Sequence, residues 1–386
     1  MLMEIEQHIR QIIRSENNIT VENLMSIVME SRYNSYYRIQ QPLGKAGDFI
    51  TAPEISQMFG EMIGIWCIDL WHKLNCPQKI DLIELGPGNG TLLHDILNAT
   101  RHIKKFSTAI SLILVEINCT LKKIQRDTLL SFNVPIKWVK SVNHIVSSYP
   151  TIILANEFFD ALPIKQYIKK INQQSGQINW LERVVKIDNN NKLYFDTIDA
   201  DINENKFLKL HNNAPNGGVL EISPAQHQTI QAVSNLLKKN GGGGLIIDYG
   251  YDISPEQRKN YQYNSSLQAV KHHQYHPLLE NLGCADLSAH VDFWSLKNIA
   301  VAEGIVSFGS ISQNVLLHKL GIKTRLNMLK QINSDENLAS KLDLQYNRLT
   351  SVRAMGELFK AIAITSAPSI IPLGFYNSNY NSFKRL

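Results

Sequence analysis

A short apolar strand, a glycine-rich turn and the start of a helix follow one another over residues 80–97, and this stretch constrains the fold more than any other. Residues 81–85 have the length and apolarity of a buried parallel strand, and the residues after Thr91 repeat at helical spacing. The glycines between them let the backbone bend sharply and approach a ligand, while the following helix presents unpaired N–H groups. The stretch therefore predicts an α/β protein with a nucleotide-type cofactor site.

The spacing of the glycines distinguishes between cofactors. A dinucleotide-binding turn has the pattern G-x-G-x-x-G, which would need a glycine where this chain has Thr91. The chain instead reads E-x-G-x-G-x-G, formed by Glu84, Gly86, Gly88 and Gly90 with Pro87 inside the turn. This mismatch argues against NAD.

The composition and charge of the chain narrow the class of protein. With 386 residues, 44% of them hydrophobic, the chain can bury a large core and form two or three domain-sized pieces. The net charge of +5 is modest and the basic residues are scattered, so we expect neither a nucleic-acid-binding surface nor a polybasic membrane segment. No run of 18 apolar residues and no signal-like N-terminus occurs, and the four cysteines form no C-x-x-C pair. We therefore expect a cytoplasmic protein with reduced, buried thiols.

Histidines gather between residues 272 and 290, where a metal site could be considered. They are His272, His273, His276 and His290. Their spacing matches neither H-E-x-x-H nor a Cys/His pairing, so we expect surface histidines and no metal.

Polar side chains follow two further predicted strands. Glu116 ends the second predicted strand, and Asn156, Glu157 and Asp160 follow the fourth. In open α/β sheets, ligands bind beyond the carboxyl ends of the strands, so we expect Glu116 to accept hydrogen bonds from ribose hydroxyls. The other three residues are expected beside the reacting group. A plainer alternative stays open, in which Asn156 caps the next turn and Glu157 pairs with Lys165.

Several strings spread over nearly the whole chain carry a family resemblance. They include GDFITAPEIS at 47–56, ELGPGNG at 84–90, ANEFFDALP at 155–163, LIIDYGY at 245–251 and MGELFKAIAIT at 355–365. In this order they resemble the MidA family, the bacterial counterpart of a mitochondrial methyltransferase that assists assembly of respiratory complex I. The resemblance implies a class I methyltransferase fold, with a Rossmann-like, seven-stranded mixed sheet, and S-adenosylmethionine as the cofactor.

The resemblance also implies where this cofactor lies. Its amino-acid end is expected on the glycine turn and its ribose at Glu116, while the GDFITAPEIS loop is expected to close over it. The expected cofactor-binding residues are Glu84, Gly86, Pro87, Gly88, Gly90, Glu116, Asn156, Asp48 and Thr51.

A protein arginine is the methyl acceptor that the resemblance implies, on a subunit of respiratory complex I. A guanidinium group has a pKa above about 12 and a fork geometry that matches carboxylates, so acids are expected at the acceptor site. The expected catalytic residues are Glu157, Asp160 and Glu221. Two other functions stay open: a small-molecule methyltransferase, and a non-catalytic assembly chaperone that binds S-adenosylmethionine for stability.

The order of predicted elements divides the chain. Five strands alternate with helices, and two late strands complete the mixed sheet. The expected segments are a helical N-terminal cover with the GDF loop (1–77), the first half of the core (78–165), an antiparallel β insertion suited to substrate access or a homodimer contact (166–213), the second half of the core (214–366) and a mobile tail (367–386). The glycine run 241–244 is expected to end a helix rather than hold a phosphate.

Overall fold

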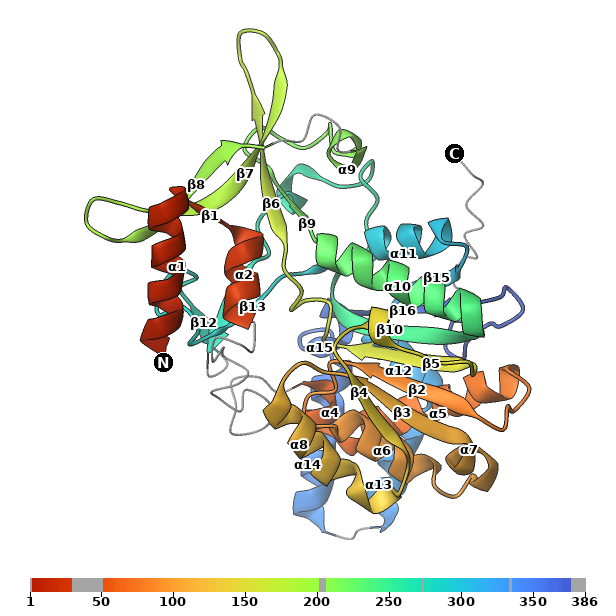
Figure 1. Cartoon of the computed structure of the whole chain (residues 1–386). Helices are drawn as coiled ribbons and strands as arrows, with labels where there is room; N and C mark the ends of the chain where they lie inside the picture. The colour runs from red at the N-terminus through yellow and green to blue at the C-terminus, as the bar shows by residue number, and fades with distance from the viewer. Residues whose placement is uncertain (1, 30–50, 201–205, 272–273, 333–334, 376–386) are drawn as a thin grey trace.

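The computed structural model describes residues 2–29, 51–200, 206–271, 274–332 and 335–375. The chain has two parts, a layered α/β core and a smaller part in which N-terminal helices pack on an antiparallel sheet (Figure 1). Asp48 and the rest of residues 47–50, the first part of the predicted closing loop, lie outside the described residues. No helix in these ranges is long and apolar enough to cross a bilayer.

The core is built on a sheet with the strand order β15-β16-β10-β5-β2-β3-β4. Its strands are β2 (Ile80–Leu85), β3 (Ile110–Val115), β4 (Ile136–Val139), β5 (Thr151–Asn156), β10 (Gly242–Tyr251), β15 (Val306–Ser312) and β16 (Phe359–Thr365), and the short β14 (Val291–Asp292) pairs with the end of β10. Neighbours from β4 to β10 are parallel, and β16 is antiparallel to both β10 and β15. This arrangement confirms the predicted seven-stranded mixed sheet. The carboxyl ends of β2, β3, β5 and β10 therefore meet at one edge.

Helices cover both faces of this sheet, because successive residues of a strand point to opposite sides. Leu82 packs with the helices α5 and α6 on one face, and Ile83 packs with α10 and α11 on the other. The helices of the core are α4 (Ala52–Ile55), α5 (Gln57–Lys73), α6 (Thr91–Thr100), α7 (Lys104–Ala109), α8 (Cys119–Leu129), α10 (Pro224–Asn240), α11 (Phe293–Ala302), α12 (Gln313–Leu320), α13 (Ile322–Ile332), α14 (Glu336–Thr350) and α15 (Met355–Leu358).

The second part joins the N-terminal helices to the predicted insertion. Strand β7 pairs antiparallel with β1, β6 and β8, and Ile19 of β1 lies opposite Val185 of β7. Ile9 of α1 and Met25 of α2 are buried in the same cluster as Val185. The elements of this part are α1 (Leu2–Glu16), β1 (Ile19–Thr20), α2 (Val21–Met29), β6 (Lys165–Ile171), β7 (Ile178–Ile187), β8 (Leu193–Asp199), α9 (Lys206–Leu210), β9 (Val219–Ile222), β11 (Gln268–Lys271), β12 (Gln274–His276) and β13 (Asp286–Ser288).

Packing changes two of the expected segment boundaries. Helix α5 belongs to the main core rather than to the N-terminal cover, because Phe59 and Trp66 are fully buried there. The expected mobile tail is packed up to its last described residue, since Ile370 is 8% exposed and Phe375 is 1% exposed in the same core.

The glycine run at 241–244 also differs from expectation. Only Gly241 ends helix α10, and the next three glycines belong to β10, between β5 and β16. A Cβ at Gly242 would lie 1.9 Å from the carbonyl oxygen of Thr151. The close pairing of β10 with β5 therefore explains why residue 242 is glycine. The end of helix α10 does not explain it.

Candidate active site

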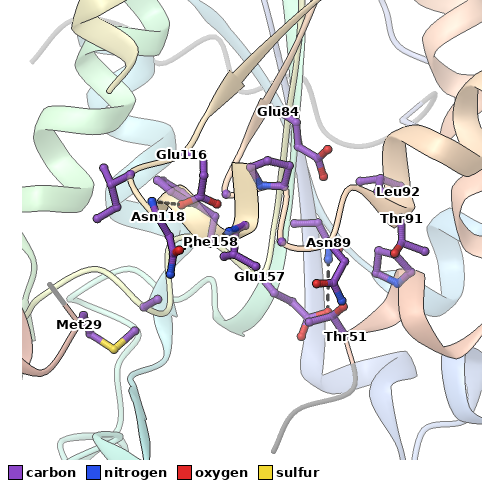
Figure 2. A pocket seen from close by; sticks show the side chains of 18 of the residues that line it. Met29, Thr51, Glu84, Asn89, Thr91, Leu92, Glu116, Asn118, Glu157 and Phe158 are labelled. Carbon is purple, nitrogen blue, oxygen red and sulfur yellow. Dashed lines mark hydrogen bonds between the residues drawn. The ribbon is translucent and has the colours of Figure 1, made fainter. Parts of the chain in front are cut away.

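A cavity of about 410 Å³ opens at the carboxyl ends of β2, β3 and β5 (Figure 2). Its walls come from the glycine turn, the segments after β3 and β5, helix α4 and the end of α2. The lining residues include Met29, Thr51, Glu54, Glu84, Pro87, Asn89, Glu116, Asn156, Glu157 and Phe158. Small-molecule and cofactor sites usually have volumes of about 300–1,000 Å³. The sheet thus brings the predicted glycine turn and both predicted strand ends to one cavity.

The glycine turn has the backbone that its sequence predicts. Gly86, Gly88 and Gly90 have φ angles of 63°, 52° and 81°, in the left-handed region that favours glycine. A Cβ at Gly86 would lie 2.8 Å from the ring of Phe158. The turn therefore needs glycine for its bend and, at Gly86, for the close approach of an aromatic ring.

Two buried acceptors on this cavity lack a partner. Glu84 Oε2 and Asn156 Oδ1 make no hydrogen bond to any of the described residues. Burial raises the pKa of Glu84 to about 8. Unsatisfied buried acceptors are unfavourable, so both atoms suit a ligand that brings N–H or O–H donors, above all a cationic amine.

Glu116 lies at the end of β3 and its two carboxylate oxygens are held separately. Oε1 accepts from the backbone N–H of Asn118 at 2.7 Å, and Oε2 accepts from Nε2 of Gln125 at 3.1 Å. Burial raises the pKa of Glu116, and these two hydrogen bonds act in the opposite direction. The side chain is oriented rather than solvated, and it lines the cavity. Gln125 was not predicted from sequence.

Glu157 occupies the centre of the site beyond β5. Its φ angle of 49° is rare for a residue other than glycine. Its Oε1 accepts from the backbone N–H of Ala52 at 2.9 Å and from Nδ2 of Asn156 at 3.2 Å. Lys165, the alternative partner, instead pairs with Glu22 at 3.5 Å. Burial, reinforced by the nearby charge of Asp160, raises the pKa of Glu157 to about 8.

Asp160 lies behind this site and does not line the cavity. It accepts a hydrogen bond from the Tyr249 hydroxyl at 2.6 Å, and burial raises its pKa to about 6. Asp248, at the end of β10, holds the turn that carries Asp160. Asp248 Oδ2 accepts from the backbone N–H groups of residues 158, 159 and 160 at 3.2, 2.9 and 3.2 Å. Asp248 belongs to the LIIDYGY string, and this role was not predicted from sequence.

Glu221 is not part of the cavity. It lies on β9 of the second sheet, where it accepts from Nε2 of Gln166 at 2.7 Å and from the backbone N–H of Ser266 at 2.9 Å. Its carboxylate is buried and satisfied, so it is a structural anchor. Glu221 was expected beside Glu157, and this expectation is wrong. The cavity lies at the carboxyl ends of strands of the central sheet, whereas β9 belongs to the second sheet.

Helix α4 supplies a carboxylate that sequence analysis missed, within the predicted loop string. Glu54 Oε1 accepts from the Thr91 hydroxyl at 2.6 Å and from Nδ2 of Asn89 at 3.2 Å. Thr51, one of the two expected loop contacts, lines the cavity just before α4. Figure 2 shows Thr51 beside the glycine turn and opposite Glu116 across the cavity.

The strand order of the central sheet and the position of this cavity are those of the class I S-adenosylmethionine-dependent methyltransferases. In the described part of the chain, no group of three or more His, Cys, Asp or Glu side chains could hold a metal ion. A family of S-adenosyl-L-methionine-dependent methyltransferases, Methyltransf_28, matches residues 62–311, and the chain belongs to that family.

Relatives over nearly the full length carry a more specific name. The chain is 31% identical to "Protein arginine methyltransferase NDUFAF7, mitochondrial" of Homo sapiens over 382 residues, covering 93% of this chain and 82% of that protein. It is 33% identical to the Caenorhabditis elegans homolog, covering 91% and 84%. A Burkholderia thailandensis protein solved with bound S-adenosyl-homocysteine has the same fold, with a TM-score of 0.84, 23% identity and coverage of 99% and 96%.

The residues of the cavity fit this cofactor. Glu84 and Asn156 would accept from the amino group of S-adenosylmethionine, and the glycine turn would admit a ligand close to the backbone. Glu116, which lines the cavity, would accept from the vicinal hydroxyls of the ribose. When bound, the cofactor supplies an electrophilic methyl group for an in-line displacement.

Proposed function

We propose that this methyltransferase modifies an arginine side chain of a protein, a subunit of respiratory complex I during its assembly. The observation that carries the proposal is the carboxylate of Glu157 on the cofactor cavity. A carboxylate whose pKa is raised by burial is stabilised as an anion when a cation pairs with it, and a guanidinium is such a cation. The names of the relatives support the same acceptor.

Glu157 has two tasks in this proposal. It orients the guanidinium through charge-assisted hydrogen bonds to its carboxylate. It also takes the proton that the guanidinium nitrogen loses on methylation, and a pKa near neutrality suits a general base. Asp160 acts indirectly in this scheme, because its negative charge raises the pKa of Glu157.

The decisive experiment compares complex I subunits from cells with and without this protein. Tryptic mass spectrometry should find a methylated arginine that disappears in the deletion strain and returns on complementation. Identical methylation in both strains, with complex I assembly impaired only in the deletion strain, would instead favour a chaperone.

The proposal also includes a cytoplasmic location and self-association. The four cysteines are free, as a reducing compartment requires, although only Cys67 and Cys284 are buried while Cys76 and Cys119 are exposed. For a homodimer, the second sheet offers β8, which pairs only with β7 in the described part of the chain. Light scattering of the purified protein and cell fractionation test these two points.

A further inference from the structure

Gln125 on helix α8 is fully buried, does not line the cavity, and joins three elements that surround it. Its Nε2 donates to the carbonyl oxygen of Gly88 at 2.8 Å and to Glu116 Oε2 at 3.1 Å. Its Oε1 accepts from Nε1 of Trp138 on β4 at 2.8 Å. One side chain therefore connects the glycine turn after β2, the carboxylate after β3 and the strand β4.

The chemistry of Trp138 fixes which way this amide points. An indole nitrogen can only donate a hydrogen bond, so the amide oxygen must face Trp138. The amide nitrogen then faces two groups that can only accept, the Gly88 carbonyl and the Glu116 carboxylate. Both of its hydrogens are used, and the reversed orientation would leave donors facing one another.

These contacts set the position of Glu116 relative to the turn. Asn118 holds one oxygen of the carboxylate and Gln125 holds the other, so the side chain cannot rotate freely. The same Gln125 nitrogen holds Gly88, whose left-handed backbone forms the middle of the turn. One amide thereby links the two ends of the expected cofactor site.

We propose that Gln125 is a positioning residue for S-adenosylmethionine, which fixes Glu116 and the glycine turn at the spacing that the ribose and amino-acid ends of the cofactor require. The inference concerns cofactor binding and does not depend on the identity of the methyl acceptor.

The test is calorimetric titration of S-adenosylhomocysteine into Gln125→Met, which keeps the length of the side chain and removes its hydrogen bonds. We expect the Kd to rise about tenfold, because a hydrogen bond to a charged group is lost. Gln313→Met is the matched control. Gln313 is also fully buried and donates to a backbone carbonyl, that of Leu349 at 2.9 Å, but it does not line or adjoin the cavity. This control should lower thermal stability and leave the Kd unchanged.

A double-mutant cycle identifies the route of the effect. If Gln125 acts through Glu116, Gln125→Met should change the Kd by less than about twofold in a Glu116→Ala background. A full tenfold effect in that background would overturn the proposal, as would an unchanged Kd in the single variant. If Gln125→Met does not fold, Trp138→Phe takes its place, since it releases the amide oxygen and retains the ring. A Kd for Trp138→Phe equal to that of the wild type would then reject the proposal.

Discussion

The backbone N–H of Ala52 donates a hydrogen bond to Oε1 of Glu157 at 2.9 Å, which joins the start of α4 to the end of β5. The same helix is tied to the glycine turn through Glu54 and Thr91. Helix α4 is therefore attached to both the cofactor side and the proposed acceptor side of the cavity. Glu157 consequently has a structural contact as well as its proposed chemical role, and a variant must preserve the former to test the latter.

Glu157→Gln meets that condition, because glutamine keeps an oxygen that can accept from Ala52 and removes the charge. We expect binding of S-adenosylhomocysteine to stay within about twofold of the wild type, while kcat for arginine methylation falls about 100-fold or more, the scale of a lost general base. Radiolabelled methyl transfer to the complex I subunit measures this.

The matched control is Glu221→Gln, a buried carboxylate outside the cavity. It should lose roughly 1–3 kcal/mol of stability and keep its kcat. Wild-type transfer by Glu157→Gln would remove Glu157 from the chemistry.

Gly88→Val should abolish tight cofactor binding. The left-handed φ of 52° disfavours a β-branched residue, and the added side chain would lie where the ligand approaches the turn. We expect the Kd for S-adenosylhomocysteine to rise roughly 10- to 100-fold, as for 1–3 kcal/mol of steric strain. Gly217→Val is the control, since Gly217 has a φ of 81° and open space around it, away from the cavity. It should destabilise the protein with no change in Kd. Equal affinity in the wild type and Gly88→Val would rule out the turn as the cofactor site.

The raised pKa of Glu84 predicts a pH dependence of stability in the ligand-free protein. Its folded pKa of about 8 lies above the value of about 4.5 in the unfolded chain, so the folded state binds more protons between these values. The contribution of Glu84 to the free energy of unfolding is therefore complete below about pH 4.5, and it is lost as the pH rises through about 8. Relative to Glu84→Gln, the wild type should lose about 1.4 kcal/mol of unfolding free energy per pH unit across this window. Urea unfolding of both proteins at pH 5.5, 6.5 and 7.5 measures the difference. A pH-independent difference between them would contradict a protonated, buried Glu84.

Asp248→Asn should loosen the turn that follows Glu157. Both oxygens of Asp248 accept from backbone N–H groups, Oδ2 from three of them and Oδ1 from that of Tyr249, so an asparagine must turn its amide nitrogen toward a donor in either orientation. We expect a stability loss of about 2–3 kcal/mol together with a lower kcat. Asp81→Asn provides the comparison. Asp81 is also buried, but it accepts a hydrogen bond from Ser111 near the amino ends of β2 and β3, away from the carboxyl edge of the sheet. It should lose stability without loss of kcat. Retention of full kcat in Asp248→Asn would show that the turn tolerates the change.

Local sequence patterns predicted the parts of the site that depend on neighbouring residues. The strand, turn and helix over 80–97 and the acid at Glu116 follow from apolar runs, glycine spacing and the geometry of parallel sheets. Gln125 could not be predicted in this way, because its partners Gly88 and Trp138 are brought to it by tertiary packing, and nothing in its own stretch of helix marks it. Glu221 shows the converse error, since its local pattern is that of an active-site acid and only the sheet to which β9 belongs excludes it.

The pairing of β1 with β7 has a consequence for how the chain matures on the ribosome. The cluster around Val185 draws on residues 5–28, 164–193 and 267–289, and most of the cofactor cavity is encoded between the first two of these stretches. Helices α1 and α2 therefore leave the exit tunnel long before the strands that bury Ile9 and Met25 have been synthesised. Exposed apolar helices of this kind attract chaperones or aggregate until their partners arrive. Helices α1 and α2 of the nascent chain should thus need protection from aggregation until translation has passed residue 289.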